Sequence, residues 1–176
     1  MTVKIGLSGA AAEAVSRIVP QLVSDLVASR ITSGDASLWG PAAEAEASVR
    51  LGWVEAVAIS RPMVDDILAL RDRLTDAGVD HIVLGGMGGS SLAPEVITRT
   101  DGAALTVLDS TDPEQVLRAL EHRLEHTAVV ISSKSGTTTE PLVFYKYWFD
   151  QVAKRRPDPG QQFVAVTDPG TLMEKM

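Results

Sequence analysis

The chain has 176 residues, a formal net charge of −7, and 45% hydrophobic residues with few aromatics (5%). This length suits one compact domain with a sizeable, mostly aliphatic core. The acidic balance argues against nucleic acid or an anionic membrane as a partner, and the lack of cysteine excludes disulfides and thiolate metal sites. No apolar run approaches the length of a membrane span and residues 1–9 lack a signal-peptide pattern, so we expect a cytoplasmic protein.

Residues 1–78 are predicted to form an N-terminal helical segment. The first helix is marked by apolar residues at the spacing of one helical face: Val15, Ile18, Val19, Leu22 and Leu26. Pro20 is expected to kink or split this helix, and Pro41 is expected to open the next one. A third helix is predicted to begin after Ser60 and to end at Gly78, because glycine commonly terminates helices.

Residues 79–176 change to an alternation of strands and helices. Short runs rich in Val, Ile or Leu are predicted as strands: 81–85, 103–108, 127–132 and 162–167. Helices are predicted between them: near 92–99, 113–122 and 138–155. This alternation predicts an α/β domain with a parallel sheet, right-handed crossovers and helices on both faces. The chain stops soon after a helix start at Thr171, so we expect a C-terminally truncated domain.

Two segments rich in glycine and hydroxyl groups follow predicted strands. They are residues 85–91 (GGMGGSS) and residues 132–140 (SSKSGTTTE). An open α/β sheet binds ligands at the carboxyl ends of its strands, and a helix N-terminus favours an anion. Hydroxyl groups donate to phosphate oxygens without a net charge on the protein, and Gly136 allows the backbone to approach a ligand closely. The two segments therefore predict a pocket for a phosphorylated molecule.

Each segment also has a simpler interpretation. Thr137 and Glu140 have the spacing of a capping box, which accounts for one hydroxyl and one carboxylate. The glycines of 85–91 are also compatible with a tight strand–helix turn. This segment is not a P-loop, because no Gly-Lys-Ser/Thr follows it, and its match to a dinucleotide loop is weak, with Asp109 a distant candidate for a ribose contact.

The remaining candidates are predicted to be structural. The three histidines are expected to be solvated or satisfied, and none has zinc-like spacing, so no metal site is predicted: His81, His122 and His126. Asp112 is favoured as the cap of the 113–122 helix. The three tryptophans are predicted to be packing residues: Trp39, Trp53 and Trp148.

The two loop segments resemble those of one enzyme family. Residues 86–94 (GMGGSSLAP) resemble the glycine–serine loop of phosphoglucose isomerase, and residues 133–141 (SKSGTTTEP) resemble that family's phosphate loop in its bacterial form. Their order, separation and strand context match as well. Residues 38–53 resemble an N-terminal segment of actinobacterial members and of the isomerase half of transaldolase–isomerase fusions. The resemblance covers nearly the whole chain but only the amino-terminal part of the family's length.

The resemblance implies a sugar-isomerase (SIS) domain with a flavodoxin-like parallel sheet of order 2-1-3-4-5, of which this chain would hold the first four strands. By position, it assigns the sugar phosphate to Ser133, Ser135, Thr138 and the main chain of Lys134, and the sugar to Gly89 and Ser90. It implies no cofactor, and a homodimer for the complete enzyme.

The family interconverts glucose 6-phosphate and fructose 6-phosphate in glycolysis and gluconeogenesis. Its ring-opening histidine, proton-transferring glutamate and enediolate-stabilising arginine are expected downstream of Met176. No catalytic residue is therefore assigned here, and the 176-residue chain alone is expected to be inactive. The alternative is a stand-alone SIS-type phosphosugar-binding or regulatory module without catalysis. A nucleotide-binding domain that uses the glycine loop is a third possibility.

Overall fold

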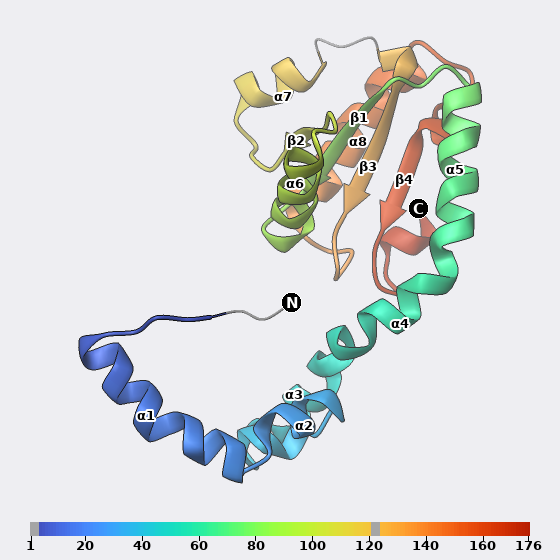
Figure 1. Ribbon diagram of the computed structural model, residues 1–176. Helices are drawn as coiled ribbons and strands as arrows, with labels where there is room; N and C mark the ends of the chain where they lie inside the picture. Colours follow the sequence, from blue (N-terminus) through green and yellow to red (C-terminus); the bar gives the residue numbers. More distant parts are fainter. Residues whose placement is uncertain (1–3, 121–123) are drawn as a thin grey trace. The chain divides into compact units, whose positions relative to one another are not determined.

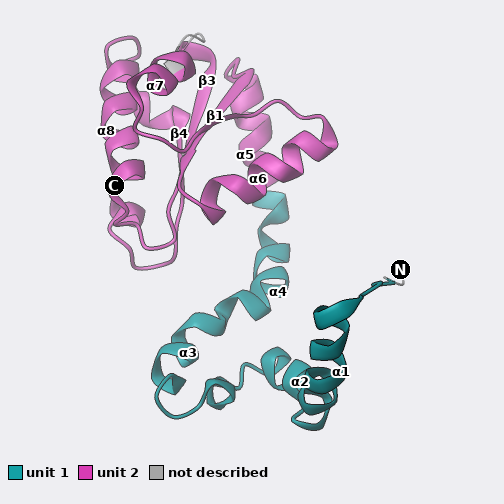
Figure 2. Cartoon of the chain, turned by 90° about the vertical axis from the view of Figure 1, so that its left-hand side faces the viewer, with its two compact units in different colours: residues 1–66 teal, residues 67–176 magenta. Residues whose placement is uncertain are grey.

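The computed structural model of the protein describes residues 4–120 and 124–176 (Figure 1). The chain divides into two compact units, residues 1–66 and 67–176 (Figure 2). The boundary between the units falls inside one helix, α5 (Val64–Asp76). The division after residue 78 that the sequence suggests stays a prediction of domain organisation.

The first unit consists of short helices and turns. Its elements in chain order are α1 (Gly9–Ser24), α2 (Val27–Thr32), η1 (Ala36–Trp39), α3 (Glu44–Arg50), η2 (Leu51–Glu55), α4 (Ala56–Ser60) and η3 (Arg61–Met63). Pro20 lies inside α1, and the chain breaks instead at Leu26, whose φ of +53° is left-handed. Pro41 lies in a turn ahead of α3, so the prediction that it opens a helix is wrong.

Apolar side chains of the first unit remain exposed. None of its helices buries a residue in the part of the chain that the structure describes. The apolar face predicted for α1 is present, but its residues range from 41% exposed at Ile18 to 63% at Leu26. Trp39 and Trp53 are 47% and 66% exposed, so the prediction that they are interior packing residues is wrong. The helices around these rings are short and leave much of each ring uncovered.

A polar network connects α2 to η1 within this unit. The Arg30 guanidinium donates from Nε to Asp35 Oδ2 over 2.6 Å and from a terminal nitrogen to Ser37 Oγ over 2.9 Å. Asp35 Oδ1 also accepts from the Ser37 backbone N–H at 3.0 Å and from the Ser37 hydroxyl at 2.6 Å. The hydrogen bond from Arg30, and then those from Ser37, lower the pKa of Asp35 from 3.8 to about 2.

The second unit is an α/β layer structure. After α5, its elements are β1 (His81–Gly86), α6 (Gly89–Asp101), β2 (Thr106–Leu108), α7 (Pro113–Leu120), η4 (Leu124–His126), β3 (Thr127–Ser132), α8 (Thr139–Ala153), η5 (Pro159–Gln162), β4 (Phe163–Val166) and η6 (Met173–Lys175). The strands form one parallel sheet in the order β2-β1-β3-β4. The predicted parallel sheet and its order are confirmed.

Helices cover both faces of this sheet. The chain passes from β1 to β2 in one direction and from β3 to β4 in the other, so right-handed crossovers put α6 on one face and α8 on the opposite one. Figure 2 shows α7 and α8 on one side of the strands and α5 and α6 on the other. The main core lies under α7 and α8, where Val83, Val129 and Ile131 meet Phe144 and Trp148. Trp148 is fully buried, so this one tryptophan packs as predicted.

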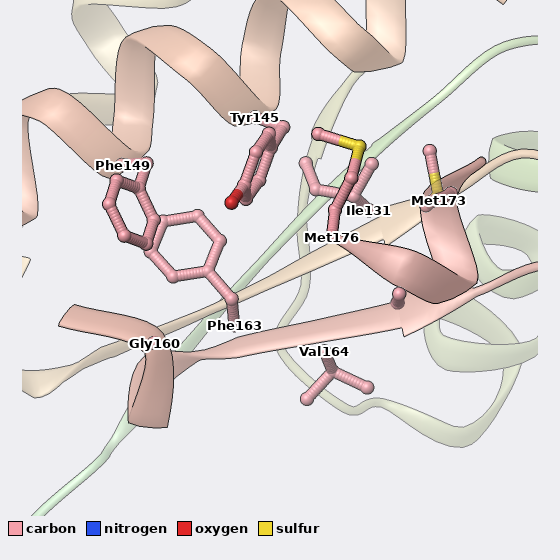
Figure 3. A pocket seen from close by; sticks show the side chains of 9 residues that line it. Ile131, Tyr145, Phe149, Gly160, Phe163, Val164, Met173 and Met176 are labelled. Atoms are coloured by element: carbon pink, nitrogen blue, oxygen red, sulfur yellow. The ribbon is translucent and has the colours of Figure 1, made fainter. Parts of the chain in front are cut away.

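A small apolar cavity of about 180 Å³ adjoins β4 on the α8 side. Tyr145 and Phe149 of α8 group with Phe163, with ring centroids 5.5 to 5.6 Å apart. Figure 3 shows these rings on one side of the cavity and Met173 and Met176 on the other. The aromatic pairs have the tilted and edge-on geometry that such rings prefer. They anchor the edge strand β4 to α8.

The opposite face of the sheet is packed more loosely. A hollow of about 360 Å³ lies between α5 and the sheet, lined mainly by Ile67, Leu70, Ile82, Val130 and Val164. Ile67 is 55% exposed and Ile82 is 41% exposed. The helix ends at Asp76 and Gly78 follows with φ +79°, which confirms the predicted stop.

Candidate functional site

The two loops predicted to bind a ligand lie at one edge of the sheet. β1 and β3 are adjacent and parallel, and their last residues, Gly86 and Ser132, are register partners. The glycine–serine loop therefore leaves the sheet beside the hydroxyl-rich loop, residues 133–138. β2 lies beyond β1 and β4 beyond β3, so the chain departs in opposite directions at this point. Such a switch point is where open α/β sheets bind ligands.

Gly86 brings the two loops into contact. A Cβ atom at Gly86 would lie 3.0 Å from the Ser132 carbonyl oxygen and 3.1 Å from the Ser90 Cβ. Ser90 is therefore held next to the end of β3, and it is half-buried. Gly89, the first residue of α6, has open space where a side chain would be. Ser91, by contrast, is fully buried and donates to the Gly88 carbonyl at 3.1 Å, so it faces inward rather than toward a ligand.

The side chains of the hydroxyl-rich loop differ in their hydrogen bonds: Ser133 donates, whereas Ser135 and Thr138 accept. Ser133 is 3% exposed, and its hydroxyl donates to Thr138 Oγ1 at 3.1 Å. Ser135 is exposed, and its oxygen accepts from the Thr137 N–H at 3.3 Å and from the Thr137 hydroxyl at 3.0 Å. Ser135 and Thr138 act as acceptors in these bonds, so their own protons stay available to a ligand. Ser133 thus bonds to Thr138 in this structure, and its predicted contact with the phosphate stays a prediction.

The first turn of α8 has no side-chain cap among the described residues. Thr138 occupies the N-cap position, but its side chain makes no bond to the first helical amides. The capping box predicted as the simpler interpretation is absent, because the helix begins at Thr139 and Thr137 lies one residue before the cap. A helix start without a cap leaves amide donors and the positive end of the helix dipole facing the loop. This arrangement suits an anion.

The side chain of Lys134 forms an ion pair with Asp168. Its ammonium nitrogen lies 3.1 Å from Asp168 Oδ2, and both side chains are more than half exposed, at 69% and 54%. Solvent-exposed pairs of this kind contribute at most about 1 kcal/mol to stability. The positive charge is therefore directed toward the segment after β4, which leaves only the Lys134 main chain for the predicted contact.

The other candidates lie elsewhere and have structural partners. His81 Nε2 is 2.8 Å from Thr106 Oγ1, and His126 Nδ1 is 2.6 Å from the Gly78 carbonyl oxygen. Both histidines lie where β1 and β3 begin, which is the edge of the sheet opposite the loops. His122 lies outside the described residues.

Two aspartates near the end of β2 are also accounted for. Asp112 Oδ1 accepts from two amides at the start of α7, at 3.0 and 3.1 Å, which confirms it as the cap of that helix. Asp109, the candidate ribose contact, accepts from the Gln115 side chain at 3.2 Å. No group of three metal-ligating side chains occurs in the described part of the chain.

Sequence reasoning missed the residues that support the hydroxyl-rich loop from the β4 side. Asp168 and Thr171 reach the loop from more than thirty positions away in sequence. No local pattern marks such contacts, and the only signal was that residues 167–170 follow a strand at the same edge of the sheet as the loop.

This geometry defines a class of protein: an open α/β fold with hydroxyl-rich loops at the switch point of a parallel sheet. No family model matches the chain. Within residues 4–120 and 124–176, every helix is too short or too polar to cross a bilayer.

Comparison with known proteins points to a particular enzyme. A glucose-6-phosphate isomerase of Chlamydia trachomatis serovar D is 31% identical in an alignment of 131 positions, which covers 68% of this chain and 25% of that protein. A glucose-6-phosphate isomerase of Bordetella pertussis is 33% identical in an alignment of 136 positions, which covers 67% of this chain and 26% of that protein. The chain spans about a quarter of the length of the curated relatives it matches.

Two solved structures also resemble this chain, and one of them is a glucose-6-phosphate isomerase. The crystal structure of a glucose-6-phosphate isomerase from Chlamydia trachomatis matches 68% of this chain and 25% of that one, with a TM-score of 0.57 and 32% identity. A hypothetical protein from Thermus thermophilus matches 93% of this chain and 38% of that one, with a TM-score of 0.66 and 25% identity. The chain is thus related, over about two thirds of its length, to part of glucose-6-phosphate isomerase. The actinobacterial or fusion subtype stays a prediction.

Proposed function

We propose that this chain supplies the sugar-phosphate-binding loops of a glucose-6-phosphate isomerase. The observation that supports this most is the meeting of the two loops at the β1–β3 switch point, where Gly86 pairs with Ser132. Ser135 and Thr138 donate to the phosphate together with the main chain of Lys134, and Ser133 holds Thr138 in place. Gly89 and Ser90 contact the sugar.

Neutral donors suit this protein because its overall charge repels an anion. The net charge is −7, so attraction to a phosphate must come from nearby groups. Hydroxyls, loop amides and the start of α8 provide donors without a cationic side chain, and bonds to a charged phosphate are about twice as strong as neutral ones. The pairing of Lys134 with Asp168 is consistent with a site that does not depend on a lysine charge.

The whole reaction proposed is the interconversion of glucose 6-phosphate and fructose 6-phosphate in glycolysis and gluconeogenesis, in a cytoplasmic homodimer. Proton transfer needs a group within hydrogen-bond reach of the transferred proton. His81 and His126 lie at the far edge of the sheet, so they are unsuited to that role. We expect the catalytic acid–base groups to lie outside these 176 residues.

Titration of the ¹⁵N-labelled chain with glucose 6-phosphate tests the proposal. We expect amide shifts at residues 89–90 and 133–139. Because a hydrogen bond to a charged group is worth about 1.5–3 kcal/mol, Ser135→Ala should raise Kd about tenfold or more. Ser48→Ala is the matched control, since its exposed hydroxyl bonds to the Ala45 carbonyl in α3, within the other unit.

Four outcomes would contradict parts of the proposal. Amide shifts confined to other residues would contradict the proposed site. Tighter binding of NAD than of glucose 6-phosphate would favour a nucleotide-binding domain. Isomerase turnover by the purified chain would refute the placement of the acid–base groups elsewhere. Tight phosphosugar binding with no isomerase activity in any longer form of the protein would favour the regulatory module.

A further inference from the structure

The segment that follows β4, residues 167–174, is attached to the hydroxyl-rich loop through the main chain. We call this segment the β4 turn. The Ser133 N–H donates to the Val166 carbonyl at 3.0 Å, and the Asp168 N–H donates to the Lys134 carbonyl at 3.2 Å. These bonds continue the parallel β3–β4 pairing beyond the last strand residues, Ser132 and Val166. The first half of the loop is therefore fixed to the β4 turn.

Side-chain packing fixes the second half of the loop. Gly136 is buried, has φ +64°, and its N–H donates to the Ser133 carbonyl at 3.2 Å. A Cβ at this position would lie only 2.7 Å from the Thr171 Cβ and 3.2 Å from the Met173 Cβ. Real Cβ atoms do not approach as closely as 2.7 Å, so Thr171 packs directly on Gly136 and leaves no room for a side chain there.

The Thr171 hydroxyl belongs to a chain of hydrogen bonds that ends on the loop. Its oxygen accepts from the Glu174 N–H at 3.3 Å and lies 2.9 Å from the Thr167 hydroxyl oxygen. Thr167 donates in turn to the Lys134 carbonyl, at 3.5 Å. With Thr167 as donor to Lys134, the Thr171 proton is directed to Thr167, and all of these bonds run in one direction.

We propose that Thr171 is a positioning residue for the phosphate loop. This inference rests on the proposed function, because it assigns the binding strength of Ser135 and Thr138 partly to a residue that touches no ligand. A loop already held in its binding conformation loses less freedom when the phosphate arrives, so affinity rises. Thr171 holds the loop in two ways: by its contact with Gly136 and by its hydroxyl link through Thr167 to Lys134.

The test compares isosteric and conservative variants of the 176-residue chain. Thr171→Val keeps the shape and removes the hydroxyl, whereas Thr171→Ser keeps the hydroxyl. The matched control is Thr100→Val, because the exposed Thr100 hydroxyl bonds to the Val96 carbonyl of its own helix. Thr167→Val breaks the same chain of hydroxyls from its other end. Amide spectra and hydrogen exchange without ligand come first, followed by titrations with glucose 6-phosphate and with inorganic phosphate.

We expect Thr171→Val to shift the amides of residues 133–138, to speed exchange of the Gly136 and Asp168 amides, and to raise both Kd values three- to tenfold. Thr171→Ser should stay within twofold of wild type, and Thr100→Val should match wild type. If Thr171→Val does not fold, as judged from the β1 and β3 amides, Thr167→Val takes its place, with an expected two- to fivefold rise in Kd.

The outcomes separate the two proposals. Wild-type loop spectra in Thr171→Val, or altered loop spectra with unchanged affinity, would overturn the positioning role. A loss of affinity that Thr171→Ser shares in full would also overturn the hydroxyl link. If wild type binds neither ligand at residues 133–139, the proposed function fails, while the ligand-free exchange data still decide whether Thr171 holds the loop.

Discussion

The two units of this chain contain similar aliphatic residues but differ in how far they bury them. In the first unit no helix buries a residue within the described part of the chain, and α1 exposes its apolar face. In the second unit a parallel sheet lies between helical layers, and Val83, Val129 and Trp148 are almost fully buried. An amphipathic helix gains stability mainly by packing its apolar face against another element. The difference shows that apolar periodicity predicts a helix but not its burial.

Replacement of a tryptophan in each unit should give the largest contrast. Trp148→Ala removes a fully buried ring from the core, and large-to-small changes of this kind cost about 3–5 kcal/mol. Trp53→Ala removes a ring that is 66% exposed, and surface changes usually stay within about 0.5 kcal/mol. Urea denaturation followed by far-ultraviolet circular dichroism measures both. Equal losses would mean that a partner surface covers Trp53 in solution.

Two glycines with left-handed backbones sharpen the comparison at smaller scale. Gly34 has φ +70° with open space around it, and Gly136 has φ +64° with Thr171 against it. A residue with a side chain pays about 1–2 kcal/mol to adopt the left-handed backbone. Gly34→Ala should therefore lower the free energy of unfolding by about that amount. Gly136→Ala should lower the free energy of unfolding by about 1–3 kcal/mol more, because the added methyl group would overpack against Thr171.

Thermal and urea unfolding measure the difference between these variants. Gly102→Ala controls for the unit in which the change is made, since Gly102 has φ +74° and open space within the second unit. If Gly136→Ala lowers the free energy of unfolding no more than Gly102→Ala does, the close packing of the loop on the β4 turn is not rigid.

The smallest effect concerns the polar network of the first unit. Asp35 has a pKa lowered to about 2, chiefly by the hydrogen bond from Arg30. A lowered pKa in the folded state stabilises the fold above the ordinary value of 3.8, and this contribution is lost as the pH falls toward 2. The carboxyl ¹³C shift of Asp35 should titrate near 2, and Arg30→Gln should move the midpoint toward 3.8. A midpoint near 3.8 in wild type would show that the network does not form.

Local sequence patterns were enough to predict most of the strands and helices of the second unit. β3 spans 127–132 as predicted, β1 is one residue longer than predicted, and Asp112 caps α7. These features depend on neighbours in sequence: apolar runs, turn residues and caps. The resemblance supplied the strand order, which local patterns do not contain.

Features that depend on distant residues could not be predicted. β2 begins at Thr106 rather than at 103, because it pairs with only the middle of β1. The exposure of Trp39 and Trp53 depends on what is packed against them, which periodicity does not report. In the site, the loops and their hydroxyls were recognised, but the inward role of Ser133 and the contact of Thr171 with Gly136 arise only in three dimensions.

Gly86 has a consequence for how this corner of the fold can vary. A methyl group there would be crowded, because its carbon would lie 3.0 Å from the Ser132 carbonyl oxygen and 3.1 Å from the Ser90 Cβ. Three residues on, Gly89 has empty space where a side chain would be. The first glycine therefore fixes the separation of the two βα corners. Under the proposed function, a side chain at position 89 would change the space beside the sugar, while position 86 would keep the spacing constant.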